Sequence, residues 1–371
     1  MLWLAGLMGL MAVGTFAFID PQNTADDGTA DAGPAPEAGD MLAQAGDVTA
    51  TSAPLDFTAF RAGAAPDTVM DGETFYDPRG GDDAADLGPL ILSPEDMILL
   101  TEGSDGDDVI EGADGNDRIA AGAGADVVTG GNGNDELRGQ DGNDTLSGNA
   151  GEDTLHGEDG TDTLSGGEAN DDLIGHNAND VLFGDDGNDL LTGSAGDDLL
   201  DGGSGDDVLH GGLDDDTLQG GTGADTLFGG WGNDLLNGAM RGADGADTDA
   251  ADFLNGGGGD DTLLAGRCDI VTAGTGADRI VLGDWISGGD ATDLIDFAPE
   301  EDSLLLVWDD SDPEAEEPLI EIYGDPDDAG RDLVLMDGEV VARIAGTGLA
   351  PEDLSLIPLS SAVTLGLAPE S

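Results

Sequence analysis

Residues 130–138 read GGNGNDELR and residues 202–210 read GGSGDDVLH. Both fit the pattern GGxGxDxUx, in which U is a large aliphatic residue. From residue 103 to residue 237, fifteen successive nine-residue units hold Asp at the sixth position and Ile, Val or Leu at the eighth. Gly opens every unit except the one that begins at Ala121. A period of this kind predicts a solenoid in which each unit packs mainly on its neighbours.

The pattern within a unit favours a turn followed by a strand. Gly adopts positive φ without a steric penalty and leaves its carbonyl group accessible, so GGxGxD suits a tight turn. The remaining xUx segment suits a short strand with its aliphatic side chain facing inward. Two units then form one turn of 18 residues, and successive turns stack in parallel. The sequence therefore predicts an all-β fold, a parallel β-roll.

The period becomes less regular after the fifteenth unit. Residues 238–255 span two periods, and the first of them has Ala243 where Asp is expected. Asp252 and Asp261 return in phase, and a unit of eight residues (AGRCDIVT) comes before Asp278. The roll is therefore expected to continue to about residue 282.

Composition divides the chain into four segments. Residues 1–19 form an apolar stretch that is long enough for one membrane span but lacks the positive start of a signal peptide, so they are an uncleaved anchor or an atypical export segment. Residues 20–89 are rich in Ala, Asp, Gly and Pro without a period, which indicates a disordered acidic linker. Residues 90–282 form the roll, including a first strand within residues 90–101. Residues 283–371 are expected to form a small β-rich domain with strands at residues 294–297, 304–308, 319–323, 333–336 and 340–344.

Charge excludes two classes of partner. The chain has 82 acidic residues against 9 basic ones, all of them Arg, and a formal net charge of -73. Such a surface repels nucleic acids and anionic lipid headgroups. The fifteen regular units alone hold 33 acidic residues and 2 Arg. The expected partners are cations, and no protein partner can be specified.

The stacking of turns predicts which cation. Sixth-position Asp residues of alternate units lie above one another along each edge of the roll, about 4.8 Å apart, and carboxylates at this spacing repel unless a cation lies between them. Calcium takes six to eight hard oxygen ligands, whereas zinc prefers His or Cys, which the repeats almost lack. The predicted side-chain ligands of calcium are Asp108, Asp117, Asp126, Asp135, Asp144, Asp153, Asp162, Asp171, Asp180, Asp189, Asp198, Asp207, Asp216, Asp225, Asp234 and Asp261.

These units resemble the RTX, or hemolysin-type, calcium-binding nonapeptide repeats of secreted bacterial proteins. The resemblance extends over residues 103–282, and the tail after Asp284 resembles less closely the region that follows such repeats. It implies that loop Gly carbonyl groups and the sixth-position Asp share each ion between successive loops. The implied carbonyl ligands are Gly103, Gly112, Gly130, Gly139, Gly148, Gly157, Gly184, Gly193, Gly202, Gly220 and Gly229.

Loss of Gly is expected to weaken or remove individual sites. Gly is replaced at the fourth position by Ala169, Ala178 and Asp214, and the unit that contains Ala243 is degenerate. Elsewhere we expect folding to be coupled to calcium binding. The repeats would then be disordered in the calcium-poor cytosol and rigid outside the cell, where calcium is millimolar.

Motifs of common catalytic centres are absent from the sequence, which contains no HExxH, no G-x-S-x-G and no P-loop. His156 and His210 occupy ninth positions three turns apart, about 14 Å at strand spacing, so they cannot share a metal ion. The main hypothesis is therefore an extracellular, calcium-loaded structural or surface protein that is not an enzyme.

Two alternatives remain open. One is a secreted enzyme or toxin-like effector that uses the repeats as a folding and export module, and the other is an adhesin anchored in a membrane by residues 1–19. The resemblance also implies export by type I secretion machinery, with an uncleaved signal for which residues 351–371 are the candidate.

Overall fold

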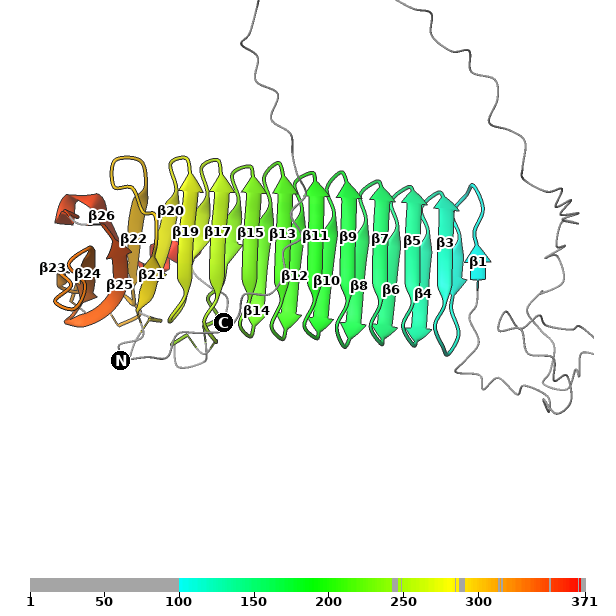
Figure 1. Cartoon of the computed structure of the whole chain (residues 1–371), viewed down its shortest axis with the longest axis horizontal. Helices are drawn as coiled ribbons and strands as arrows, with labels where there is room; N and C mark the ends of the chain where they lie inside the picture. Colours follow the sequence, from blue (N-terminus) through cyan, green and yellow to red (C-terminus); the bar gives the residue numbers. More distant parts are fainter. Residues whose placement is uncertain are drawn as a thin grey trace, which may run out of the picture. The chain divides into compact units, whose positions relative to one another are not determined.

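The nine-residue units build a parallel β-solenoid of about ten turns (Figure 1). The computed structural model describes residues 100–241, 246–247, 249–283, 285–286, 291–312, 314, 316–346, 348–365 and 367. The expected anchor or export segment, the acidic linker and residues 90–99 lie outside the described residues. Each unit supplies one strand, and each strand pairs in parallel with the strand two places along the chain, as where Leu137 of β5 lies beside Leu155 of β7. The predicted turn of 18 residues is thus confirmed.

The strands of the described residues form two sheets of 14 and 12 strands. In sheet order, the first contains β1 (Leu100–Glu102), β3 (Arg118–Ala123), β5 (Glu136–Asp141), β7 (Thr154–Asp159), β9 (Asp172–Asn177), β11 (Leu190–Ala195), β13 (Val208–Leu213), β15 (Thr226–Trp231), β17 (Phe253–Gly258), β19 (Ile270–Thr275), β21 (Thr292–Leu294), β25 (Glu339–Ala345), β24 (Arg331–Met336) and β23 (Ile320–Gly324). The second contains β2 (Val109–Glu111), β4 (Val127–Asn132), β6 (Thr145–Ala150), β8 (Thr163–Glu168), β10 (Val181–Asp186), β12 (Leu199–Ser204), β14 (Thr217–Thr222), β16 (Leu235–Asn237), β18 (Thr262–Leu264), β20 (Arg279–Gly283), β22 (Ser303–Trp308) and β26 (Leu354–Pro358).

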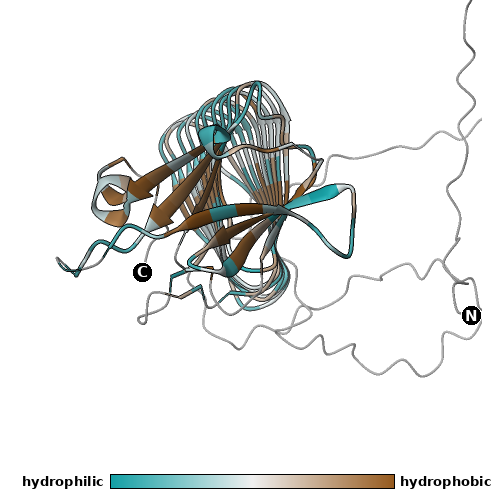
Figure 2. Cartoon of the chain, turned by 90° about the vertical axis from the view of Figure 1, so that its left-hand side faces the viewer, coloured by the Kyte–Doolittle hydropathy of each residue, from teal (hydrophilic) through white to brown (hydrophobic). Residues whose placement is uncertain are grey.

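The eighth-position side chains fill the space between the two sheets. From Ile119 to Leu236 these side chains are at most 2% exposed, and most are fully buried. Figure 2 shows the turns one behind another, with hydrophobic strands on both sides of this narrow core. The prediction that the aliphatic residue of each unit faces inward is confirmed.

The strands are longer than the three residues expected from xUx. Strand β5, for example, begins at Glu136 and runs through the first three residues of the next unit to Asp141. Stacking explains the difference, because Gln140 of this extension lies in register beside Glu158 one turn later, so backbone pairing continues into the GGx segment. The turn proper is therefore confined to the fourth to sixth positions.

Most fourth-position residues have a left-handed backbone. Gly142 has a φ of 146°, and a Cβ atom there would collide with the carbonyl oxygen of Gly124 in the preceding turn. Ala169, Ala178 and Asp214 adopt left-handed conformations at the same position, with φ of 81°, 74° and 75°. Each costs roughly 1–2 kcal/mol relative to Gly.

The region after residue 283 continues the same two sheets. Strand β20 pairs in parallel with β22, and β21 pairs with β19 on one side and β25 on the other. Strands β23, β24 and β25 then form an antiparallel end to the first sheet.

The four later strands expected from the sequence are present with small shifts, but the strand expected at residues 294–297 ends at Leu294. It ends there because the side chain of Asp296 accepts hydrogen bonds from the backbone N–H groups of Ala273 and Gly274.

Three further elements follow that the sequence did not predict: the 3-10 turn η2 (Pro351–Asp353), strand β26 and helix α1 (Leu359–Thr364). Strand β26 pairs in parallel with β22 and extends the second sheet. Among the described residues, no helix combines the length and the apolar character that a membrane span requires.

Adjacent Leu residues on opposite faces of β11 test the packing. Leu191 is fully buried, whereas Leu190 is 38% exposed. Leu191→Ala should lower the free energy of unfolding by about 2–5 kcal/mol, while Leu190→Ala should cost less than about 1 kcal/mol. Urea unfolding of both variants in excess calcium measures the difference, and equal effects would contradict the assigned core.

Candidate metal centre

The sixth-position Asp residues stack along the two edges of the roll. In each stack the backbone N–H of one Asp donates to Oδ1 of the Asp one turn later, as from Asp180 to Asp198 at 2.8 Å and from Asp198 to Asp216 at 2.9 Å. We call each stack an Asp ladder. The first ladder contains Asp108, Asp126, Asp144, Asp162, Asp180, Asp198, Asp216, Asp234, Asp261, Asp278 and Asp302. The second contains Asp117, Asp135, Asp153, Asp171, Asp189, Asp207, Asp225, Asp252 and Asp269.

The second carboxylate oxygen of most ladder residues is buried without a partner. Among the described residues, no hydrogen-bond donor reaches the Oδ2 atoms of Asp126, Asp135, Asp144, Asp153, Asp162, Asp171, Asp180, Asp189, Asp198, Asp207, Asp216, Asp225, Asp234, Asp252, Asp261 and Asp278. Leaving a buried carboxylate oxygen unsatisfied costs free energy, so each such group needs a proton or a cation.

The first-position Gly makes room for this oxygen. A Cβ atom on Gly139 would collide with Oδ2 of Asp144 and lie 2.9 Å from the carbonyl oxygen of Gly157, which opens the unit one turn later. Oxygen atoms of two successive turns thus converge beside the same Cα atom. Gly at this position avoids that collision, although the unit opened by Ala121 still holds Asp126 buried with a partnerless Oδ2.

The beginning of each ladder differs from its middle. Oδ2 of Asp108 accepts hydrogen bonds from the backbone N–H and the hydroxyl group of Ser104, which lower the pKa of this carboxyl. Oδ2 of Asp117 accepts a hydrogen bond from the backbone N–H of Ala113. The partnerless oxygens begin at Asp126, one turn into the roll.

Burial raises the pKa of the ladder carboxyls from Asp135 to Asp278 above the ordinary value for Asp. The pKa of Asp180 rises to about 7, first because of desolvation and then because Asp162 and Asp198 lie close by. Desolvation, with the charges of Asp198 and Asp234, raises the pKa of Asp216 to about 8. Desolvation and the nearby Asp269 raise the pKa of Asp252 to about 10. The roll therefore resists carrying these negative charges unless positive charge compensates them.

Sequence reasoning missed four members of the ladders as site residues. Asp252 and Asp278 were in phase but were not assigned as ligands, and Asp269 lies in the unit of eight residues. Asp302 lies beyond the expected end of the roll, yet its Oδ1 accepts a hydrogen bond from the backbone N–H of Asp278 at 3.2 Å. The spacing of Asp two residues before a buried aliphatic residue, as in Asp302 and Leu304, could have identified the last two.

Units that lack the fourth-position Gly retain the ladder geometry. Asp171, Asp180 and Asp216 belong to the units with Ala169, Ala178 and Asp214, and they are at most 4% exposed. Their Oδ2 atoms are buried without a partner like those of the regular units. Weaker binding at these units stays a prediction.

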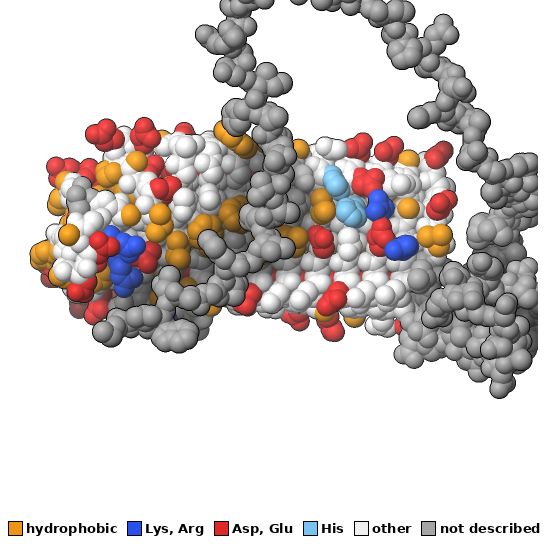
Figure 3. All heavy atoms as spheres, viewed as in Figure 1, with side chains coloured by type: hydrophobic (Ala, Val, Ile, Leu, Met, Phe, Trp, Pro, Cys, Tyr) orange, Lys and Arg blue, Asp and Glu red, His pale blue; other side chains and the backbone are white. Residues whose placement is uncertain are grey.

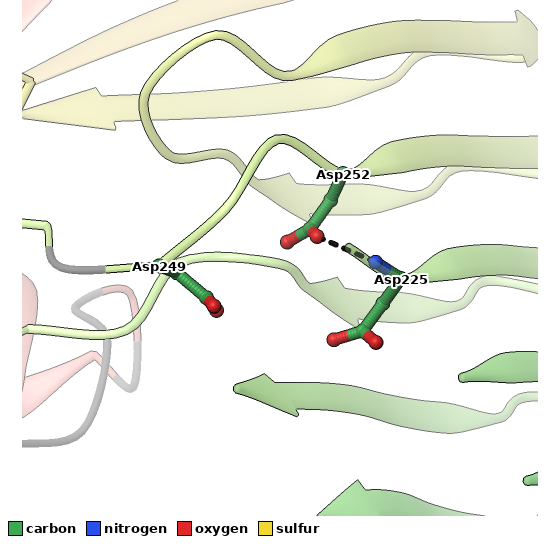
Figure 4. A group of neighbouring side chains, drawn as sticks. All are labelled: Asp225, Asp249 and Asp252. Carbon is green, nitrogen blue, oxygen red and sulfur yellow. Dashed lines mark hydrogen bonds between the residues drawn. The ribbon is translucent and has the colours of Figure 1, made fainter. Parts of the chain in front are cut away.

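A third carboxylate joins the second ladder beside the degenerate unit. Asp225, Asp249 and Asp252 each place an oxygen within 4.8 Å of the others (Figure 4). Asp249 lies in the connection between β16 and β17, where its Oδ1 accepts a hydrogen bond from the backbone N–H of Gly223 at 2.7 Å. Its Oδ2 is buried without a partner, as is that of Asp252. The repeat pattern gave no sign of Asp249, because it occupies a variable third position.

The fold and its buried carboxylates define a cation-binding parallel β-roll. Residues 102–267 match the family model of the RTX calcium-binding nonapeptide repeat, in segments 102–137, 138–173, 174–209, 210–248 and 242–267. This part of the chain is an RTX repeat β-roll, a structural calcium-binding module, which confirms the resemblance seen in the sequence. A search of the curated proteins finds no significant match to the chain.

The raised pKa values predict an unusual pH dependence when calcium is removed by a chelator. Ladder carboxyls such as Asp198 and Asp216 have pKa values of about 6 and about 8 in the roll, against 3.8 for an ordinary Asp. The folded roll therefore binds more protons than the unfolded chain between about pH 4 and pH 8, so its stability is lost as the pH rises through this window.

Thermal unfolding followed by circular dichroism at pH 5 and pH 8 measures this effect. With chelator, the midpoint temperature should be higher at pH 5, and with excess calcium it should be higher at pH 8, because protons displace the metal. A chelator-treated roll that is more stable at pH 8 would contradict the burial of these charges.

Proposed function

We propose that this chain is an extracellular calcium-binding protein, without enzymatic activity, whose roll folds when calcium binds. The observation that carries the proposal is the buried, partnerless Oδ2 atom that recurs every nine residues along the regular units. Such an atom gains most from a cation, and calcium prefers carboxylate and carbonyl oxygens. A protein built in this way supplies a rigid rod in calcium-rich surroundings and an extended chain elsewhere.

The proposed ligands come from two successive turns. Asp144 contributes its Oδ2 atom from one turn, and Gly157 contributes its carbonyl oxygen from the next, as their convergence beside Gly139 supports. The same relation recurs at Gly148, where Oδ2 of Asp153 and the carbonyl oxygen of Gly166 converge. Bound calcium supplies the positive charge that allows neighbouring carboxylates to remain ionised at close spacing.

The group of Asp225, Asp249 and Asp252 is proposed as a further calcium site, at a place where the degenerate unit interrupts the repeat. The connection between β16 and β17 brings a third carboxylate to the ladder. Calcium affinity increases with the number of charged ligands. The third carboxylate at this site would therefore offset the Asp ligand that is missing from the unit with Ala243.

Export through type I secretion machinery is the proposed route out of the cell. RTX repeats are typical of secreted proteins. Folding that depends on millimolar calcium would keep the repeats unfolded until they leave the cytosol. Residues 351–371, which include β26 and α1, remain the proposed location of an uncleaved secretion signal.

Neighbouring Asp residues in one loop test calcium binding directly. Asp198 is a buried ladder residue, whereas Asp197 is exposed, so Asp197→Asn is a charge-matched control for Asp198→Asn. Asp198→Asn should raise several-fold the calcium concentration at which half of the strand signal forms, and Asp197→Asn should leave it nearly unchanged. Circular dichroism during calcium titration, with magnesium as the control ion, gives the midpoints.

Without calcium the penalty of Asp198→Asn should disappear. The substitution removes a buried charge from the ladder, so with chelator at pH 5 the midpoint temperature of unfolding should be no lower than that of the unaltered chain. Equal calcium midpoints for the two variants, or folding of the unaltered chain by magnesium alone, would contradict the proposal.

A further inference from the structure

His156 and His176 meet on the outer face of the first sheet, away from the Asp ladders. Nδ1 of His156 lies 3.1 Å from Nε2 of His176, and the ring centroids are 5.4 Å apart. The two residues come from neighbouring strands, β7 and β9, and from different positions of their units, the ninth and the second. Figure 3 shows His side chains gathered on this face beside acidic and Arg side chains.

The separation of the two ring nitrogens suits chelation of one metal ion. Two imidazole nitrogens bound to one tetrahedral zinc ion at about 2.0–2.1 Å lie about 3.3 Å from each other. Without a metal, the same arrangement is an N–H···N hydrogen bond between two rings. Only small side-chain movements separate the two states, because both strands are held in register by the sheet.

Carboxylates flank the pair on both sides. In the register of β7 and β9, Glu158 lies beside His176, and Asp172 is the diagonal neighbour of His156. All four side chains lie on the same face because residues two apart in a strand point the same way. Oδ1 of Asp172 is buried and has no hydrogen-bond partner among the described residues. Rotation of this side chain toward the rings would make the oxygen a third ligand. In the part of the chain that the structure describes, only Asp225, Asp249 and Asp252 already bring three ligand atoms within 4.8 Å of one another.

The positive charge nearest to the pair is already balanced. Arg138 lines the same depression as the two imidazoles, but its guanidinium group lies 2.8 Å from Glu136 and 3.7 Å from Glu158. A cation bound by the imidazoles therefore meets a surface on which acidic groups predominate.

We propose that His156 and His176, with Asp172 or Glu158 as a third ligand, form a binding site for a zinc-like divalent transition-metal ion. The site is chemically distinct from the Asp ladders, because imidazole nitrogen binds zinc, copper and nickel in preference to calcium. Its position on the flat face of the roll leaves a coordination position open to solvent or to a group from another molecule.

His210 provides an internal control. It occupies the same ninth position as His156, three turns along the same face, but it stacks on Phe228 with ring centroids 4.8 Å apart and planes inclined by 4°. The chain has three His residues, and the other two, His156 and His176, contact each other. No second imidazole therefore reaches His210 among the described residues. His210→Gln therefore removes an equivalent ring without removing the proposed site.

Zinc titration of the full chain in saturating calcium tests the proposal, with a chromophoric zinc chelator as competitor. The unaltered chain and His210→Gln should bind one zinc ion with equal affinity. His156→Gln and His176→Gln should each weaken that binding at least about tenfold, because each removes one of two nitrogen ligands. Circular dichroism in calcium establishes that each variant is folded.

Two results would overturn the proposal: zinc affinity that is the same in all three variants, or no zinc binding by the unaltered chain. Equal zinc affinity in the three variants would show that the ion binds to loop carboxylates instead. If a variant does not fold, its zinc titration is replaced by chemical modification of the His residues of the unaltered chain with diethyl pyrocarbonate. Zinc should then protect His156 and His176 from modification while His210 still reacts, and equal reactivity of all three would contradict the site.

Discussion

The roll depends on a conflict between two requirements of the same carboxylate. Each ladder Asp must enter the interior so that its Oδ1 can accept the backbone N–H of the preceding turn, as Asp198 does for Asp180. In the regular units from Asp126 to Asp234, Oδ2 is thereby buried without a donor and close to the next charge in the stack. Hydrogen bonding thus fixes the turn, while desolvation and repulsion oppose it. The positive charge of bound calcium compensates the desolvation and repulsion of the carboxylates, while the hydrogen bond to Oδ1 is kept.

The remaining features of the fold follow from this constraint. The core is a single line of aliphatic side chains, such as Leu191 and Leu200, which is narrow for a chain of this length. First-position Gly residues leave room for the carboxylate, and fourth-position Gly residues such as Gly142 allow the loops to stack closely. A sequence so poor in side chains can hold one structure only if the cation contributes to its stability.

Much of this arrangement could be predicted from the sequence, because the period of nine fixes both the register and the inward side chain. The pairing of Leu137 with Leu155 follows directly from it. The extension of strands into the GGx segment could not be predicted from the sequence, because it arises from backbone pairing between turns. Asp249 and His176 were also missed as site residues. Asp249 occupies a variable third position, and His176 replaces the second Gly of the pattern. Asp225 and His156 lie 24 and 20 residues before them in sequence, and only the stacking of turns brings these pairs close.

Amide hydrogen exchange at neutral pH tests the central claim most directly, because it reports on the hydrogen bonds that build the ladders. With calcium, the N–H groups of Asp180 and Asp198, which donate to the carboxylates of the next turn, should exchange slowly. With a chelator, the same groups should exchange at the rate of an unfolded chain. Slow exchange that persists after calcium is removed at neutral pH would show that the ladders form without a cation, which contradicts the account.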